Sequence, residues 1–390
     1  MEHSYVPGVV RETVRVVHII IGLNIGGAEL MLKRLIESHN TNNTIKHFVI
    51  SLTNMGPVGR QLMDTGIAVY SLGITNIINV PFAFFELRSL LVKIKPDIVQ
   101  TWMYHADFFG GIVAKSIGCD NILWNVRSTN IHKGGSKITI VIRKICSILS
   151  NYIPRKIICA AEASRIEHEK VGYVKNKMIV IPNGFKHQTA VNKYFSKIDF
   201  RAGVGLQKGH VVVLSVGRFS EVKDHKTFIK AADLVAELIP NLQFLMVGRG
   251  VTRENHNLMR MLKEVKNPDI FVLLGERDDV TDFMLASDVF CMHSKTEGFP
   301  NVLGEAMLCG LPCISTDVGD AKYLLNNSSW IVQPSNPNEL AHKLYQLLSL
   351  PESERVVLGN IAAKRIRMEF SIDKMSHGYL ELYKAIYANR

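Results

Sequence analysis

Short apolar runs alternate with helical segments along nearly the whole of this 390-residue chain. Such runs, bounded by glycine and polar residues, are typical of buried strands in a parallel sheet that helices cover on both faces. Regular alternation of strand and helix predicts an α/β fold with doubly wound parallel sheets. In the first half, strands are predicted at residues 14–21, 47–52, 68–72, 97–101, 122–126, 156–160 and 178–181.

The alternation starts a second time after a polar, lysine-containing stretch at residues 185–209. A new apolar run at residues 211–216 opens this second half. A chain of this length, with 47% hydrophobic side chains, can bury two substantial cores. We therefore expect a first domain at residues 1–190, a second at 191–370, and a last helix within 371–390.

The charge balance bounds the class of partner. Forty-six Lys and Arg against thirty-five Asp and Glu give a formal net charge of +11. Such a surplus indicates a partner of opposite sign, which is nucleic acid, anionic lipid or a phosphate-bearing substrate. The six cysteines form no C-x-x-C pair, which favours a reduced, cytoplasmic compartment. We expect neither secretion nor a membrane span, because the sequence lacks a signal-peptide core and any uncharged apolar stretch of about 18 residues.

Residues 293–319 carry the most specific local pattern. Pro300 stands where a helix would begin and a glycine stands where it would end, so a short helix is predicted at residues 301–309. Its N-terminal N–H groups and its dipole would form an anion site suited to phosphate. Glu297 precedes this site and Glu305 lies inside the helix. Two glutamates alone more often cap and solvate a surface helix, so both interpretations stand at this point.

Polar or glycine-rich segments follow several predicted strands, where parallel sheets bind ligands. They are the glycine loop at residues 22–27, His105, Arg127, and the pair Arg218 and Lys223. An Arg and a Lys past a strand end can bind a diphosphate, although two surface cations at a helix start explain them as well. A lone histidine is more often structural, and Arg127 is equally compatible with either role.

Several motifs together resemble one known family. They are E-G-F-P-N-V at residues 297–302 with a second Glu eight residues after the first, G-x-P at 310–312, T-x-x-G at 316–319, G-G-A-E at 26–29, P-N-G at 182–184 and G-R…K-D at 217–224. The combination is similar to the GT-B retaining glycosyltransferases of family 4. This resemblance implies two Rossmann-like domains that face each other across a cleft, with a terminal helix returning to the first domain.

The resemblance also implies residue roles. Glu297 would bind hydroxyls of the donor sugar, Glu305 the ribose, and Arg277 the nucleotide base. The matching positions are His105, Arg218, Lys223 and Glu297 for catalysis, and Gly26, Gly27, Gly217, Arg277, Phe299, Pro300, Asn301, Val302 and Glu305 for donor binding, the diphosphate lying on the amides near Asn301 and Val302. One departure is visible, because Asp320 follows T-x-x-G where many relatives have a second glycine. It bears on which donor is used.

The activity implied is transfer of a sugar from a UDP- or GDP-sugar to a glycan acceptor, which we expect to be lipid-linked and part of cell-surface polysaccharide assembly. The nucleotide-sugar is a substrate, so no cofactor is expected. The sequence contains no D-x-D, and Arg218, Lys223 and the helix dipole would take the place of a metal. A GT-B epimerase would share the donor site but needs further acid–base residues. A nucleic-acid-binding protein is suggested by charge alone and lacks a recognised module.

Residues 131–156 interleave basic and apolar side chains. Helices of this kind lie on anionic membranes, which would place the protein on the inner face of the cell membrane. A packed helix with a solvated charged face explains the pattern equally well.

Overall fold

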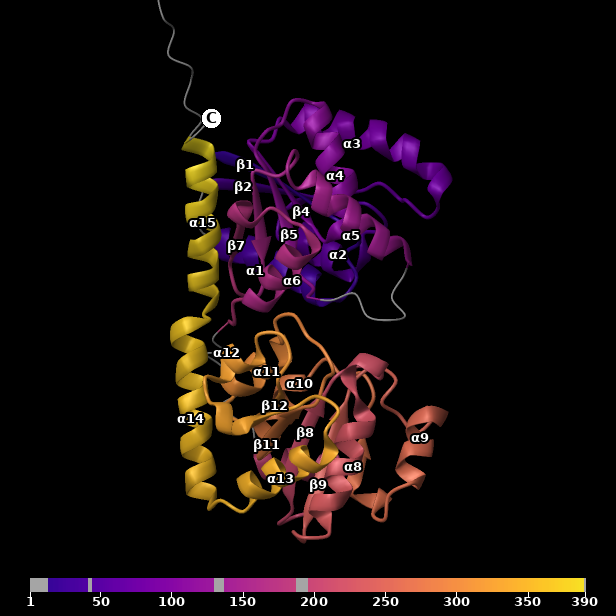
Figure 1. Ribbon diagram of the computed structural model, residues 1–390, viewed down its shortest axis with the longest axis vertical. Helices are drawn as coiled ribbons and strands as arrows, with labels where there is room; N and C mark the ends of the chain where they lie inside the picture. The colour runs from indigo at the N-terminus through magenta and orange to yellow at the C-terminus, as the bar shows by residue number, and fades with distance from the viewer. Residues whose placement is uncertain (1–12, 41–43, 130–136, 187–195, 389–390) are drawn as a thin grey trace, which may run out of the picture.

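The computed structural model describes residues 13–40, 44–129, 137–186 and 196–388. It contains two separate β-sheets, and every strand pairing in both is parallel. The two sheet domains lie one above the other along the long axis of the molecule (Figure 1). The predicted α/β class with doubly wound parallel sheets is confirmed.

The first sheet has seven strands in the order β3-β2-β1-β4-β5-β6-β7. Its strands are β1 (Val14–Ile20), β2 (Ile45–Ser51), β3 (Ala68–Ser71), β4 (Ile98–Trp102), β5 (Ile122–Val126), β6 (Lys156–Cys159) and β7 (Met178–Val180). The helices between them are α1 (Gly27–His39), α2 (Gly56–Asp64), α3 (Val80–Ile94), α4 (Tyr104–Ser116), α5 (Lys137–Leu149) and α6 (Glu162–Val171), with the single turns η1 (Ile77–Asn79) and η2 (Lys175–Lys177). Helix α5 forms part of the basic segment predicted at residues 131–156. Residues 131–136 of that segment lie outside the described residues.

The second sheet has six strands in the order β10-β9-β8-β11-β12-β13. Its strands are β8 (Val211–Val216), β9 (Leu242–Val247), β10 (Phe271–Leu273), β11 (Val289–Met292), β12 (Cys313–Thr316) and β13 (Ile331–Val332). Its helices are α7 (Lys197–Gly203), α8 (His225–Ala236), α9 (His256–Lys263), α10 (Val280–Ala286), α11 (Asn301–Leu308), α12 (Ala321–Leu325) and α13 (Pro337–Leu348), with the turns η3 (Glu221–Lys223), η4 (Pro268–Ile270) and η5 (Ser328–Trp330). The helix predicted at residues 301–309 is α11.

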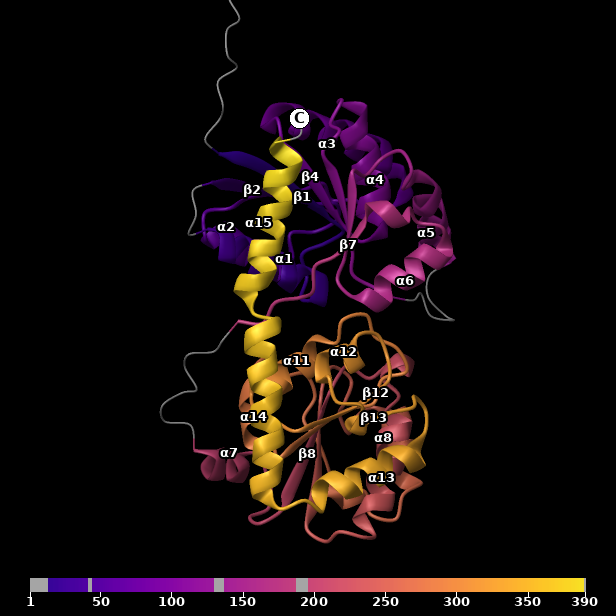
Figure 2. The ribbon, with the colours of Figure 1, turned by 60° about the vertical axis from the view of Figure 1, so that its left-hand side comes forward.

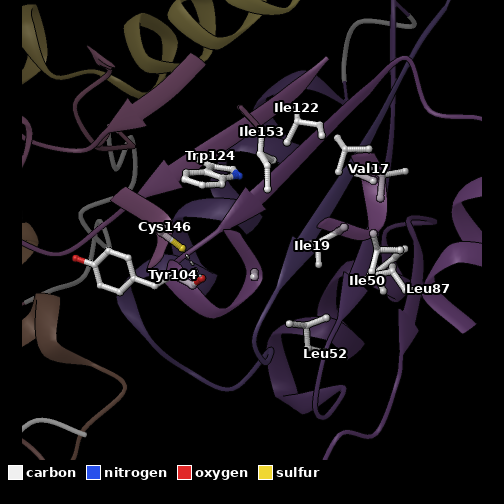
Figure 3. Close-up of a cluster of buried hydrophobic side chains, with 14 of the residues drawn as sticks. Val17, Ile19, Ile50, Leu52, Leu87, Tyr104, Ile122, Trp124, Cys146 and Ile153 are labelled. Atoms are coloured by element: carbon white, nitrogen blue, oxygen red, sulfur yellow. Dashed lines mark hydrogen bonds between the residues drawn. The ribbon is translucent and has the colours of Figure 1, made fainter. Parts of the chain in front are cut away.

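Each sheet buries apolar side chains on both faces, because successive residues of a strand point to opposite sides. On β1, Val17 and Ile19 pack into one hydrophobic cluster, whereas Val16 and Ile20 pack into another on the opposite face. Figure 3 shows the first of these clusters, where Trp124, Cys146 and Tyr104 lie on one side and Ile50 and Leu87 on the other. Burial on both faces explains why the strands are almost uniformly apolar.

Two long helices run along both domains at the end of the chain. α14 (Glu352–Glu369) packs against α11 of the second domain, and α15 (Ile372–Ala388) packs against α1 of the first. Figures 1 and 2 show them as one yellow column beside the two sheets. The predicted domain limit at residue 370 falls between these helices, and the limit at residue 190 lies outside the described residues.

The two chain segments that cross between the domains are hydrogen-bonded to each other. Phe185 donates its N–H to the carbonyl of Phe370 at 2.8 Å, and Ile372 donates to the carbonyl of Phe185 at 2.9 Å. Gly184 permits this approach, since a Cβ there would lie 2.7 Å from the Cα of Ile372. The P-N-G motif therefore ends in a glycine for a steric reason.

A chain of three buried histidines ties α15 to the first sheet. Trp102 Nε1 lies 3.2 Å from Nδ1 of His18, whose Nε2 lies 2.9 Å from Nδ1 of His47. His47 Nε2 lies 3.2 Å from Nδ1 of His39, whose Nε2 lies 3.0 Å from the carbonyl of Ser376 in α15. Indole can only donate and a carbonyl can only accept, so all three rings are neutral, with the proton on Nε2. Burial lowers the pKa of each ring, that of His18 to about 3.

We expect acid to destabilise the protein through these histidines. The folded His18 ring stays neutral down to about pH 3, whereas the unfolded ring takes up a proton near the ordinary imidazole pKa of about 6.5. The unfolded state therefore binds more protons, and stability is lost as the pH falls below 6.5. One such ring accounts for about 2 kcal/mol of unfolding free energy between pH 7.5 and pH 5.0.

Denaturant unfolding at those two pH values measures this loss. Between pH 7.5 and pH 5.0, the unfolding free energy of His18→Gln should fall by about 2 kcal/mol less than that of the wild type. The matched control is His256→Gln, at an exposed position of α9, which should keep the wild-type pH dependence. An unchanged pH dependence in His18→Gln would contradict the assignment of neutral rings.

Candidate functional site

The strand orders of the two sheets place the predicted site residues at equivalent points. In both sheets the order reverses between the first and fourth strands of the domain, at β1 and β4 and at β8 and β11. Open parallel sheets bind ligands beyond the carboxyl ends of the strands at such a reversal. Gly26 and His105 follow β1 and β4, whereas Lys223 and Glu297 follow β8 and β11.

An ion pair lies at the centre of the second-domain site. Lys223 Nζ is 2.5 Å from Oε1 of Glu297, and both side chains are largely shielded from solvent. Ser294 Oγ donates to the same Oε1 at 2.6 Å, and the Ser294 carbonyl accepts from Thr316 Oγ1 at 2.7 Å. Both bonds to Glu297 use Oε1, and within the described residues Oε2 remains as an acceptor for another hydroxyl or amide.

His293 holds the Lys223 turn in place, although sequence reasoning assigned it no role. Its Nε2 accepts from Ser215 Oγ at 2.6 Å and its Nδ1 donates to the Lys223 carbonyl at 2.5 Å. The ring stacks on Phe228 at 4.6 Å between centroids. Burial, with a smaller effect of the nearby His225, holds the pKa of His293 well below its usual value, so the ring is neutral. The signal in the sequence was a histidine directly after an apolar strand.

Glycines let the strand-end loops of this domain pack closely. A Cβ on Gly217 would lie 3.2 Å from Cδ of Lys223, so the lysine stem covers this glycine. Gly248 has φ of 151°, and a Cβ there would lie 2.1 Å from the Gly217 carbonyl oxygen. Gly319 has φ of 54°, and a Cβ there would lie 2.1 Å from the Gly298 carbonyl oxygen. Gly248 was not predicted as a site residue, although it too directly follows a strand.

The N-terminus of α11 adjoins the Glu297 loop. Its N-cap residue is Pro300, whose carbonyl accepts from Leu303 and Gly304, so the N–H groups of Asn301 and Val302 have no acceptor within the helix. These are the two amides predicted to hold a diphosphate, and that role stays a prediction.

The Phe299 side chain lies inside the apolar core, 7% exposed. It packs between Phe185 at 6.0 Å and Phe370 at 5.9 Å, measured between ring centroids. Any contact of Phe299 with a donor would therefore use its backbone.

Residues of the first domain contact α11 directly. The Asn301 side-chain oxygen accepts from Asn183 Nδ2 at 2.6 Å, and a Cβ on Gly27 would lie 3.6 Å from Asn301 Nδ2. Arg34 of α1 pairs with Oε1 of Glu305 at 3.1 Å. The start of α1 and α11 are thus in contact across the boundary between the domains.

Three other predicted residues make no contact with these groups that the structure shows within its described residues. Arg218 is exposed and has no hydrogen bond or ion pair within the described part of the chain. Arg277 is exposed and forms two hydrogen bonds with Asp279, at 2.8 and 2.7 Å. His105 is half-buried in the first turn of α4, and burial lowers the pKa of its ring. Their roles stay predictions.

Arg127 also faces the interdomain site. Its guanidinium donates to Asn183 and to Asn125 and lies over the ring of Trp102, 5.3 Å from the centroid. Among the residues that the structure describes, no three His, Cys, Asp or Glu side chains gather as metal ligands. Whether a metal is needed stays a prediction.

Comparisons with known proteins identify relatives of this chain. Residues 196–365 match the family model described as glycosyl transferases group 1. The chain is 31% identical over 256 residues to a UDP-Gal:alpha-D-GlcNAc-diphosphoundecaprenol alpha-1,3-galactosyltransferase of Escherichia coli, a match that covers 63% of this chain and 64% of that protein. It therefore spans just under two thirds of that relative. The putative glycosyltransferase EpsF of Bacillus subtilis is 25% identical over 320 residues, covering 78% and 79% of the two chains.

A solved structure extends the likeness to the whole fold. Anabaena HepE in complex with UDP superposes with a TM-score of 0.82 at 18% identity, covering 95% of this chain and all of that one. The predicted GT-B arrangement of two facing Rossmann-like domains is confirmed.

We expect Gly248→Ala to destabilise the second domain. The left-handed backbone costs roughly 1–3 kcal/mol for a residue with a side chain, and the new Cβ would also collide with the Gly217 carbonyl. Thermal or denaturant unfolding should show a fall in unfolding free energy of at least about 2 kcal/mol. Gly203→Ala in α7 is the control, because a Cβ there meets nothing within 4 Å. Equal stability of the two variants would contradict this packing.

Proposed function

We propose that this chain, whose residues 196–365 match the family model of the group 1 glycosyltransferases, transfers a sugar from a UDP- or GDP-sugar to a hydroxyl of a lipid-linked glycan, with retention of configuration. The observation that carries the proposal is the Lys223–Glu297 ion pair beside the N-terminus of α11. A cation, a carboxylate and free helix amides at the same place match a phosphate bound next to sugar hydroxyls.

The second domain would hold the leaving group. As the bond between the sugar carbon and the diphosphate oxygen breaks, negative charge grows on the diphosphate. Lys223, the exposed Arg218 and the amides of Asn301 and Val302 are placed to stabilise that charge. The acceptor hydroxyl attacks from the same face, and its proton passes to the leaving phosphate oxygen. No metal and no cofactor enter this proposal.

The two glutamates keep one oxygen each for the donor. Glu297 uses Oε1 for Lys223 and Ser294, so Oε2 would accept sugar hydroxyls. Glu305 uses Oε1 for Arg34, so its second oxygen would accept the ribose hydroxyls. His105 is uncharged near neutral pH because burial lowers its pKa, and it would orient the sugar by hydrogen bonding.

The acceptor is proposed from the Escherichia coli relative, whose name specifies a sugar on diphosphoundecaprenol. A lipid carrier requires access to a membrane. Within the described residues, no helix is long and apolar enough to span a bilayer. We therefore propose contact with the membrane surface, on its cytoplasmic side.

Helix α5 is the proposed contact. Ile138, Val141 and Ile148 are 67%, 57% and 61% exposed, although they are large aliphatic residues. The helix also carries the exposed Lys137 and Lys144 and no acidic residue. Exposed apolar side chains beside unopposed positive charge fit the headgroup region of an anionic membrane.

Donor turnover tests the proposed activity. UDP- and GDP-sugars are offered with and without membrane extract, and nucleotide release is measured. We expect release that depends on the extract. Isomerised sugar without release would favour an epimerase instead, and inertness toward every donor would favour a binding protein.

Two variants test the site itself. Lys223→Ala and Glu297→Ala should each lower turnover roughly a hundredfold or more, because each removes a group that would contact the donor. Lys295→Ala and Glu221→Ala are matched controls. Lys295 Nζ and Glu221 Oε1 form a neighbouring ion pair at 3.8 Å, and their side chains are more exposed. The thermal unfolding midpoint should stay close to wild type in all four. Near-normal turnover in either site variant would refute the site.

Vesicle binding tests the membrane contact. The triple variant Ile138→Ser, Val141→Ser and Ile148→Ser should partition at least roughly tenfold less to vesicles of phosphatidylglycerol and phosphatidylcholine, since it removes the apolar area that would be buried. Serines at Val356, Val357 and Ile361 of α14 form the control, because those side chains are exposed to a similar degree. Co-sedimentation that is equal in the two triple variants would rule out α5 as the contact.

A further inference from the structure

Asp320 lies at the junction between the two domains. It precedes α12 in the second domain and is 4% exposed. Its Oδ2 accepts from the N–H of Glu162 at 2.8 Å, and its Oδ1 accepts from the N–H of Ala163 at 2.9 Å. Both donors lie in the first turn of α6, which belongs to the first domain. The carboxylate therefore caps a helix of the opposite domain.

Helix α6 cannot supply this cap itself. Its N-cap residue is Ala161, which has no side-chain oxygen and makes no side-chain capping bond. A carboxylate at a helix N-terminus satisfies free N–H groups and lies favourably in the helix dipole. Burial raises the pKa of Asp320, and the two amides of α6 are what lowers it again. Contact between the domains therefore gives this buried carboxylate two hydrogen bonds from α6.

The backbone of Asp320 is hydrogen-bonded to the loop that carries Glu297, residues 294–300, which we call the donor loop. Its N–H donates to the carbonyl of Gly298 at 3.0 Å, and the preceding Gly319 packs against the Gly298 and Glu297 carbonyls. One residue therefore joins α6 of the first domain to the backbone directly after Glu297.

The other end of the same loop is held from the first domain too. Arg127 donates to the side-chain oxygen of Asn183, which in turn donates to the side chain of Asn301. A Cβ on Gly298 would also lie 3.2 Å from the Arg127 carbonyl oxygen. The loop from Glu297 to Asn301 is thus in contact with the first domain at both of its ends.

We propose that Asp320 is a positioning residue, which couples closure of the interdomain cleft to the placement of Glu297. When the domains separate, the carboxylate leaves the two amides of α6, and the loop loses its contacts with the first domain. When they close, the same bonds fix the loop and with it the Glu297 carboxylate. This inference rests on the proposed function only for its effect on catalysis, since the coupling itself is a property of the apo protein.

Hydrogen–deuterium exchange of the full chain tests the coupling without substrate. In Asp320→Ala we expect faster exchange in two places, the first turn of α6 at residues 162–164 and the donor loop at 294–299. Small-angle scattering should show a larger radius of gyration. The matched control is Asp317→Ala, which removes an exposed carboxylate three residues away and should leave all three measurements unchanged. Unchanged exchange at α6 would overturn the cap, and faster exchange at α6 alone would overturn the coupling.

Kinetics test the consequence for catalysis. Asp320→Ala should lower kcat by about tenfold with little change in the KM for the acceptor, because a misplaced Glu297 acts on the reacting sugar. Asp320→Asn keeps one oxygen for one of the amides and should recover part of the loss, which also covers the case in which the alanine variant does not fold. A kcat equal to that of Asp317→Ala, despite faster exchange in the donor loop, would overturn the catalytic role. If the wild type turns over no donor, the proposed function fails, while the exchange measurements still decide the coupling.

Discussion

The relative placement of the two domains depends on two backbone hydrogen bonds, which join Phe185 to the Phe370–Ile372 segment. They join two described segments that lead from one domain to the other, so both crossings are held together at one point. Because parallel strands all end at the same edge of their sheet, the loops that carry the site converge from both domains on the space beside this point. Gly184 is part of this constraint, since a side chain there would separate the crossings.

Two ion pairs at the site neutralise both glutamates in the absence of substrate. Lys223 is neutralised by Glu297, and Glu305 is neutralised by Arg34 across the domains. The free amides of α11 and the exposed Arg218 remain as uncompensated positive groups. A dianionic diphosphate would reach these groups without breaking either ion pair, and each glutamate would keep one oxygen for hydroxyl groups. In the proposed reaction, the ion pairs would preorganise the carboxylates at little cost in reorganisation.

The sequence predicted those features that depend on local spacing. The strands, the helix after Pro300 and the glycines after strands all follow from apolar periodicity or turn geometry. Contacts between residues far apart in the chain were out of reach. Nothing local to Asp320 shows that it caps α6, because its partner Ala163 lies 157 residues away in the sequence. Nothing local to Phe299 shows that Phe185 and Phe370 bury its ring. His293 shares this limit, because its two partners lie on a different strand and turn.

Helix α4 connects the proposed membrane helix α5 with the proposed interdomain site. Cys146 of α5 lies with its sulfur 3.6 Å from the carbonyl oxygen of Tyr104, the residue next to His105 (Figure 3). Tyr104 is fixed from the other side by its hydroxyl, which lies 2.7 Å from Nε2 of His168 in α6. α6 is in turn the helix that Asp320 caps. A lipid-linked acceptor held against α5 would therefore meet the same short set of helices that positions His105 on one side of the cleft and the Glu297 loop on the other.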